Sequence, residues 1–370
     1  MPIGETVDSR TPQQLRPKSS RLPSLDGLRA ISIFMVIVGH LNGTRGLGAF
    51  SLGIGDYAHL GVLVFFVISG FLITTLLIKE NEDSGTVSLK LFYSRRALRI
   101  FPVAYSFLGL LLLLWSMGLI DLNTRDLWHA ATYTVNYQPG PSWDVGHLWS
   151  LSVEEQFYLL WPFAFILLGP RKGLSFAMVV VLLAPLARIF NRFILIGTPY
   201  HNLAMFPMVA DTLAVGCILA LGREWLESQS WYLRLFDWRI SLAMIVAVLV
   251  LNRLMDYTVV SVFGLCAVNV LLAVLIHRSV YRADDSVGRF LNWRPIAFVG
   301  VLSYSLYVWQ QLFLNRNSAS WTSAFPQNLV LTSAVTLLSY LLMEKPLLRL
   351  RHRLRAKRAQ PQLASPPSGG

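Results

Sequence analysis

A histidine and a pair of carboxylates stand in long apolar stretches, where ionisable side chains are costly unless they are paired or line a polar cavity. His40 follows Arg29 by eleven residues, which in a helix puts both on one face, about 16 Å apart along the axis. Glu154 and Glu155 stand near the start of another apolar stretch. Because a carboxylate fixes the tautomer of an imidazole and stabilises its charged form, such a pair suits general base catalysis. We therefore predict that one of the two carboxylates lies against His40; the alternative is a polar pair that only locks two helices together.

Two arginines, Arg96 and Arg99, stand at the start of a further apolar stretch. Residues three apart project from the same side of a helix, and paired guanidinium groups suit bidentate binding of phosphate. An alternative interpretation is that these residues only set the membrane topology, since basic residues collect at cytoplasmic helix ends.

Other polar groups also interrupt the apolar stretches. Asp211 is a lone acid that could pair with Arg188 or Arg192, or line a cavity. The stretch over residues 296–315 is unusually polar, which predicts that one face lines the same interior, although an aromatic and amide belt at the interface would look similar. Its polar and aromatic residues are Ser303, Tyr304, Ser305, Tyr307, Trp309, Gln310 and Gln311.

The composition indicates which elements position these residues. Of 370 residues, 54% are hydrophobic and only 14% are charged, against about 25% charged in soluble domains, and the mean hydropathy is +0.51. This excludes a disordered chain, and two cysteines exclude a disulfide scaffold. The net charge of +12 would suggest a nucleic-acid partner, but the basic residues are dispersed between apolar runs. The composition predicts an all-α, polytopic membrane protein.

Ten stretches approach the roughly 20 apolar residues that a transmembrane helix needs. The first and the seventh are short or polar at one end. The first 24 residues are polar and no cleavage site follows them, so we expect no signal peptide. The ten predicted spans are 25–42, 59–78, 100–120, 147–168, 173–190, 203–222, 238–252, 257–276, 296–315 and 325–343.

The distribution of basic residues supports this map. If the N-terminus is cytoplasmic, 26 of the 32 Lys and Arg residues fall on the cytoplasmic side and six on the other, a strong positive-inside bias. An even number of spans places both termini in the cytoplasm. We predict a disordered N-terminus over 1–22, a transmembrane domain over 23–350 and a disordered basic tail over 351–370, all in a multi-pass protein of the cytoplasmic (inner) membrane.

From residue 23 to about 350 the chain resembles the membrane-bound acyltransferase 3 family, integral-membrane enzymes that acylate hydroxyl groups. Four motifs occur in the right order and at consistent membrane depth, together with a second span similar to that of the family. The motifs are Arg29 with His40, Arg96-x-x-Arg99 followed by Ile-Phe-Pro, the segment from Trp149 to Tyr158, and Met343-Glu344-Lys345-Pro346.

The resemblance implies transfer of an acyl group, most often acetyl from acetyl-CoA, to a cell-surface glycan, a lipid-linked sugar or a small metabolite. It implies catalysis by His40 and Glu154, and donor binding by Arg29, Arg96 and Arg99. One position departs from the family pattern, because Trp309 is followed by Gln310 where similar sequences usually have histidine. Residues predicted to bind the acceptor or to support the site are Asp26, Ser150, Ser152, Asp211, Tyr304 and Gln310.

Our hypothesis is that acyl-CoA enters from the cytoplasm and that His40 acts as general base on the acceptor hydroxyl, with Glu154 as its partner. Imidazole is also a competent nucleophile, so an acyl-histidine intermediate is the alternative. A transporter or flippase for a lipid-linked sugar is the alternative function, although the inverted halves of many transporters are not visible. We expect no metal, because no Cys/His cluster has the spacing of metal ligands, and no nucleic-acid partner.

Overall fold

A computed structural model describes residues 22–48, 56–198 and 202–349. These residues form helices joined by turns, with no strand among them, which confirms the all-α prediction. Apart from Leu22, the expected terminal extensions lie outside the described residues.

The helices are numbered in chain order, with short 3-10 or π segments labelled η. They are α1 (Leu25–Leu41), α2 (Tyr57–Ser84), α3 (Leu89–Ser116), α4 (Thr124–Ala131), η2 (Val135–Tyr137), α5 (Trp143–Gly146), α6 (Leu148–Phe193), α7 (Phe206–Ser228), α8 (Ser230–Arg234), α9 (Trp238–Arg253), η3 (Val260–Gly264), α10 (Leu265–Tyr281), α11 (Ser286–Leu291), α12 (Arg294–Phe313), η4 (Trp321–Ser323), α13 (Gln327–Ser339) and η5 (Tyr340–Glu344).

Seven of the described helices are long and apolar enough to cross a membrane. Each of the ten predicted spans coincides with a helix, but α1 and α9 have only 17 and 16 residues, and the fourth and fifth spans fall within the single helix α6. The structure therefore supports a multi-pass membrane protein, while the count of ten spans and the orientation of the termini stay predictions.

Helix α6 bends sharply at Gly169, which has φ 68° and ψ 177° and precedes Pro170. A straight helix of its 46 residues would be about 69 Å long. Instead its two halves are linked by a chain of three hydrogen bonds. Asn136 donates to Gln156 in the first half and accepts from Asn202, which itself accepts from Asn191 in the second half. The chain thus reverses at Gly169, as two adjacent predicted spans require.

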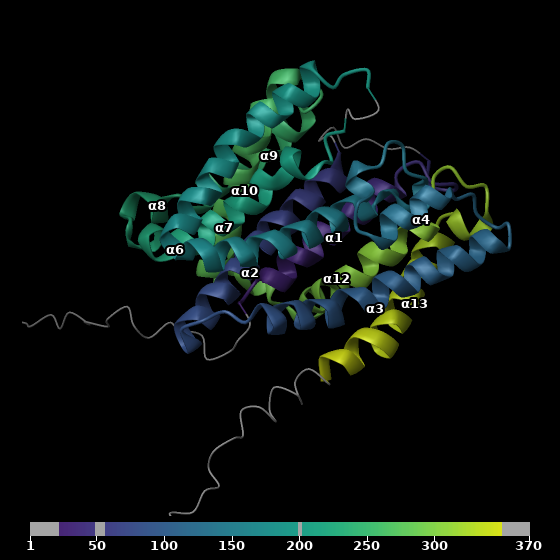
Figure 1. Cartoon of the computed structure of the whole chain (residues 1–370), viewed down its shortest axis with the longest axis horizontal. Helices are drawn as coiled ribbons and strands as arrows, with labels where there is room; N and C mark the ends of the chain where they lie inside the picture. The colour runs from purple at the N-terminus through teal and green to yellow at the C-terminus, as the bar shows by residue number, and fades with distance from the viewer. Residues whose placement is uncertain (1–21, 49–55, 199–201, 350–370) are drawn as a thin grey trace, which may run out of the picture.

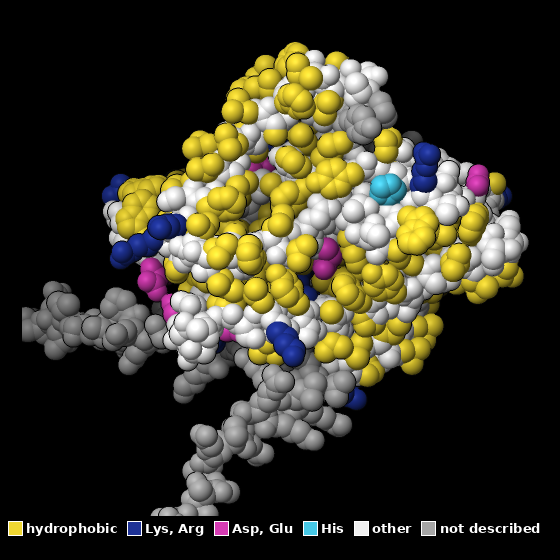
Figure 2. All heavy atoms as spheres, viewed as in Figure 1, with side chains coloured by type: hydrophobic (Ala, Val, Ile, Leu, Met, Phe, Trp, Pro, Cys, Tyr) yellow, Lys and Arg dark blue, Asp and Glu magenta, His cyan; other side chains and the backbone are white. Residues whose placement is uncertain are grey.

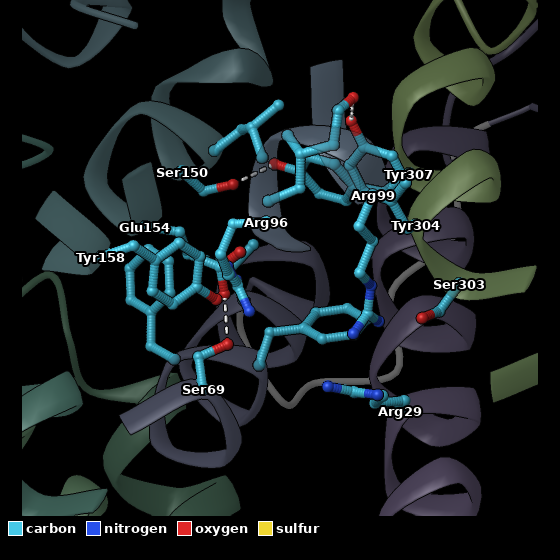
Figure 3. A pocket seen from close by; sticks show the side chains of 15 residues that line it. Arg29, Ser69, Arg96, Arg99, Ser150, Glu154, Tyr158, Ser303, Tyr304 and Tyr307 are labelled. Carbon is cyan, nitrogen blue, oxygen red and sulfur yellow. Dashed lines mark hydrogen bonds between the residues drawn. The ribbon is translucent and has the colours of Figure 1, made fainter. Parts of the chain in front are cut away.

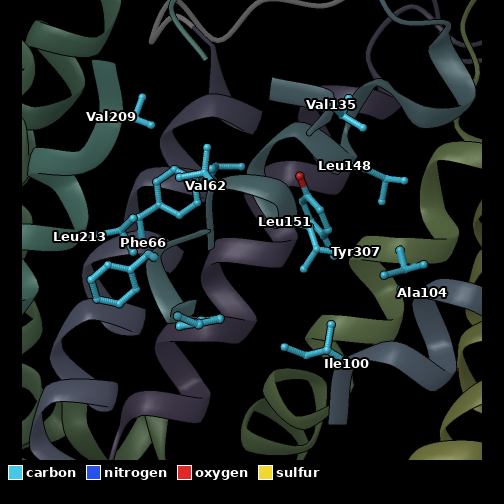
Figure 4. Close-up of a cluster of buried hydrophobic side chains, with 14 of the residues drawn as sticks. Val62, Phe66, Ile100, Ala104, Val135, Leu148, Leu151, Val209, Leu213 and Tyr307 are labelled. Carbon is cyan, nitrogen blue, oxygen red and sulfur yellow. The ribbon is translucent and has the colours of Figure 1, made fainter. Parts of the chain in front are cut away.

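Helices α1 and α2 lie at the centre of the bundle (Figure 1), with α7 to α10 on one side and α3, α12 and α13 on the other. Helix α1 packs against α2 and α12, and α2 packs against α7. A large cluster of buried side chains joins α2, α3, α6, α7 and α12 (Figure 4). The outer surface in the view of Figure 2 is largely hydrophobic, as contact with lipid requires.

Two glycines set the close approach of α2 and α7. A Cβ added to Gly70 would collide with the backbone of Leu213, and one added to Gly216 would collide with that of Val67. Small residues allow such backbone contact between membrane helices, whose association gains little from the hydrophobic effect. Ser69, the neighbour of Gly70, is thereby held in the interior, with 7% of its surface exposed.

A buried ion pair connects α6, α7 and α10. The Arg188 guanidinium pairs with Asp211, as one of the predicted alternatives required, and also donates to the carbonyl oxygens of Met208 and Val262 at 2.9 and 3.0 Å. Asn269 donates to the second carboxylate oxygen of Asp211 at 3.0 Å. Since both charged side chains are fully enclosed, removing one partner would leave a buried charge without compensation.

Asp211→Asn is expected to lower the free energy of unfolding by about 3–5 kcal/mol, because it leaves Arg188 charged and unpaired. The measurement is the unfolding transition of the purified protein in detergent. The matched control is Arg188→Met combined with Asp211→Leu, which removes both charges and should recover most of the loss. An Asp211→Asn protein that unfolds like the wild type would contradict this assignment.

Candidate active site

A small polar cavity of about 80 Å³ lies at the centre of the bundle (Figure 3). Helix α1 contributes Arg29, α3 contributes Arg96 and Arg99, and α6 contributes Glu154. The spacing of three residues places both α3 arginines on the side that faces the cavity. The structure therefore brings together the three predicted donor-binding arginines and one of the two predicted catalytic residues. The other polar lining residues are Ser69, Ser150, Tyr158, Ser303, Tyr304 and Tyr307.

Glu154 is the carboxylate at this cavity. Its Oε1 accepts a hydrogen bond of 2.6 Å from Ser69 Oγ, and the three arginines act on it electrostatically. Tyr158 stands one helical turn beyond Glu154. The Arg96 guanidinium lies 3.3 Å from the centre of the Tyr158 ring, so a cation–π contact helps to hold the Arg96 side chain in place. Glu154 thus partly neutralises a cluster of three cations.

A second cavity, of about 430 Å³, continues from the first toward the end of the bundle where α1 begins. The two cavities share Arg29 and Arg99. The second is also lined by Asp26, which lies 3.7 Å from Arg29, and by Glu344, which accepts a hydrogen bond from Ser305. Arg29 and Arg99 thus lie between the two cavities, with Glu154 on one side and Asp26 and Glu344 on the other.

His40 lies in the last turn of α1, at the opposite end from Arg29. Its Nδ1 is 2.9 Å from Oε1 of Gln310 on α12, and its ring meets that of Trp143 edge-on at 5.9 Å. With the amide oxygen as acceptor, Nδ1 carries the proton and Nε2 keeps a free lone pair. Gln310, the position that departs from the family pattern, is therefore the group that sets the tautomer of His40.

The predicted contact between His40 and Glu154 is wrong. Among the described residues, His40 pairs with Gln310 and Glu154 pairs with Ser69. The reason is the position of Glu154 along α6. His147, at the N-terminal end of this helix, interacts electrostatically with His40. Glu154 lies seven residues further along, which is about 10 Å. The carboxylate is drawn to the arginines instead.

A hydrogen-bonded group separates the arginine cavity from His40. The Tyr307 hydroxyl bonds to Ser150 Oγ at 2.5 Å and donates to the backbone oxygen of His147 at 2.6 Å. His147 Nε2 lies 3.1 Å from the carbonyl oxygen of Val308, which makes Nε2 the donor and leaves Nδ1 as an acceptor. That Nδ1 is buried and has no hydrogen-bond partner in the described part of the chain.

Sequence reasoning missed Ser69, Trp143 and His147 as neighbours of the site. His147 stands only three residues before Ser150, so its place in the same segment was the available signal. Ser69 and Trp143 have no such signal, because tertiary packing alone brings them to Glu154 and His40.

The remaining predicted site residues fall in three places. Tyr304 lines the arginine cavity and donates to the carbonyl oxygen of Ile100 at 2.6 Å. Ser152 is buried beside the cavity, where it donates to Leu148 and accepts from the backbone of Val135. Asp211 belongs to the separate network of Arg188. Within the described residues, no group of three or more His, Cys, Asp or Glu side chains could hold a metal ion.

Comparison with known proteins identifies the family of this chain. A family model for an acyltransferase domain, Acyl_transf_3, matches residues 22–344. The O-acetyltransferase OatA of Staphylococcus aureus strain NCTC 8325 is 28% identical over 373 residues, which cover 88% of this chain and 57% of OatA. A protein of Staphylococcus aureus strain COL that carries the provisional name O-acetyltransferase is 30% identical over 313 residues. The match covers 79% of this chain and 50% of that relative.

The chain spans about half the length of these curated relatives. No solved structure matches it. The family match covers nearly the whole described chain and includes the arginine cavity, Glu154 and His40. The chain therefore belongs to the acyltransferase 3 family.

Proposed function

We propose that the protein is an integral-membrane O-acyltransferase that uses acyl-CoA as donor. The observation that carries this proposal is the cluster of three guanidinium groups around the central cavity, which Glu154 also lines. Guanidinium groups that converge on one cavity suit bidentate binding of phosphate. The phosphate groups of acyl-CoA supply such an anion, and the larger cavity beside Asp26 and Glu344 provides an entrance for it.

In the proposed reaction, Nε2 of His40 removes the proton from an acceptor hydroxyl group. The hydroxyl oxygen attacks the thioester carbonyl carbon, the carbon–sulfur bond breaks, and the imidazolium returns the proton to the departing thiolate. Gln310 holds the tautomer that leaves Nε2 free. Glu154 serves as a positioning residue that attracts the Arg96 guanidinium electrostatically, and not as the partner of His40.

We further propose that the acyl group is acetyl and that the protein lies in the cytoplasmic membrane with both termini inside. The names of the relatives support acetyl transfer to oxygen, and the bias of basic residues supports the orientation. The acceptor is a surface glycan, a lipid-linked sugar or a small metabolite. Mass spectrometry of the surface polysaccharides and small metabolites of a deletion strain, in search of a lost acetyl group, tests these classes.

His40→Ala is expected to lower kcat by roughly 10²- to 10⁴-fold, the contribution typical of a general base. The assay follows radiolabelled acetyl-CoA with the purified protein, as transfer to an acceptor or as hydrolysis. The matched control is His129→Ala, because His129 lies outside the site in α4. Normal turnover in a folded His40→Ala protein would overturn this role, and wild-type protein that neither transfers nor hydrolyses the acetyl group would favour a transporter.

Arg99→Ala is expected to raise the KM for acetyl-CoA by about 10- to 100-fold with a smaller change in kcat, because a charge-assisted contact to phosphate is lost. Initial rates over a range of acetyl-CoA concentrations measure the effect. Arg125→Ala, at an exposed position in α4, is the control. An unchanged KM would remove Arg99 from the donor site.

Gln310→Leu is expected to lower kcat by roughly tenfold or more while the KM for acetyl-CoA stays unchanged, because the hydrogen bond that orients His40 is lost. The same kinetic assay separates the two constants. Gln327→Leu, at an exposed position at the start of α13, is the control. If Gln310→Leu instead changes only the KM for acetyl-CoA, Gln310 acts in donor binding and not on His40.

A further inference from the structure

An apolar groove of about 580 Å³ lies on another face of α1 from the arginine cavity. It runs between α1 and α2 on one side and α9, α10 and α11 on the other. Apolar side chains such as Ile31, Leu242 and Ile245 line it, and these three are 39%, 54% and 44% exposed. Because the exposed face of a transmembrane helix contacts acyl chains, the groove opens to lipid and has a volume typical of ligand sites, roughly 300–1,000 Å³.

One end of this groove is polar. A second cavity, of about 730 Å³, shares Trp238 and Arg278 with the groove. It is also lined by the exposed arginines Arg234 and Arg282. Arg278 is held in place by Asp285, at 2.8 Å, and by a bond to the carbonyl oxygen of Phe236.

The polar cavity lies where α9 begins and α10 ends, at the same end of the bundle as the start of α1. Trp238 marks this level, with 62% of its surface exposed, as tryptophan does at the boundary between acyl chains and headgroups. Three arginines against Asp237 and Asp285 leave the lining with an excess of one positive charge.

We propose that the groove and the polar cavity together form a binding site for one anionic phospholipid of the adjacent leaflet. The acyl chain fills the groove between α1 and α9, and the phosphate lies among Arg234, Arg278 and Arg282. Basic cavities between transmembrane helices at this level favour anionic headgroups. An apolar groove beside a basic cavity favours a lipid over a second copy of this chain. An apolar helix of a second copy could fill the groove, but it would bring no negative charge to the arginines.

The test uses the full-length protein in detergent with phosphatidylglycerol or phosphatidylcholine, and native mass spectrometry to count retained lipid. The wild type is expected to retain phosphatidylglycerol in preference to phosphatidylcholine. Arg234→Gln with Arg282→Gln should weaken phosphatidylglycerol retention by about tenfold or more, since each basic residue contributes to anionic lipid binding. Ile245→Trp should abolish retention of this lipid by filling the groove.

Matched controls separate the site from general effects. Arg171→Gln with Lys172→Gln removes two exposed charges at the bend of α6, and Leu183→Trp adds bulk to an exposed position of α6; both should retain the lipid like the wild type. Equal retention of the two lipids, or loss in the controls, would overturn the proposal. Thermal stabilisation by soluble glycerol phosphate equal to that by phosphatidylglycerol would also overturn it, because it would indicate that the site binds a free anion. A wild-type dimer that dissociates in the Ile245→Trp variant would overturn it too, because it would indicate that a second copy of the chain fills the groove.

Discussion

One small cavity inside the apolar helix bundle holds three guanidinium groups, those of Arg29, Arg96 and Arg99. Burying these charges is costly, and this cost explains which polar residues lie around the cavity. Charges in such surroundings require partners. Among the described residues that line the cavity, Glu154 is the one with a carboxylate, and Ser69 donates a hydrogen bond to it. The approach of α2 to α7 at Gly70 is what holds Ser69 in reach. Helix packing and active-site chemistry therefore depend on the same few contacts.

The candidate site is divided along the axis of α1. The cationic cavity opens toward the end where α1 begins, and His40 stands near the other end of the same helix. Tyr307 and Ser150 close the space between them through a mutual hydrogen bond. In the proposed reaction the donor at the arginines and the acceptor near His40 would approach from opposite ends of α1, and the length of this helix fixes the distance between Arg29 and His40.

Much of this organisation follows from local sequence. Apolar length places the helices, and the spacing of Arg96 and Arg99 places both in the cavity, because helical periodicity is a local property. The Arg188–Asp211 pair was one of the predicted alternatives because a lone buried acid needs a cation. The partner of His40 was not predictable in this way. Seven residues separate His147 from Glu154 along α6, and the relative heights of two helices depend on tertiary packing that no local pattern encodes.

Helix α1 has 17 residues and rises about 25 Å, less than the roughly 30 Å of a hydrocarbon core. Arg29 and His40, near its two ends, are only about 16 Å apart along the axis. A helix this short crosses a bilayer only where the bilayer thins around it or where flanking side chains reach to the interface. Each ångström of mismatch costs a fraction of a kcal/mol, so α1 favours a thin membrane or a locally thinned one.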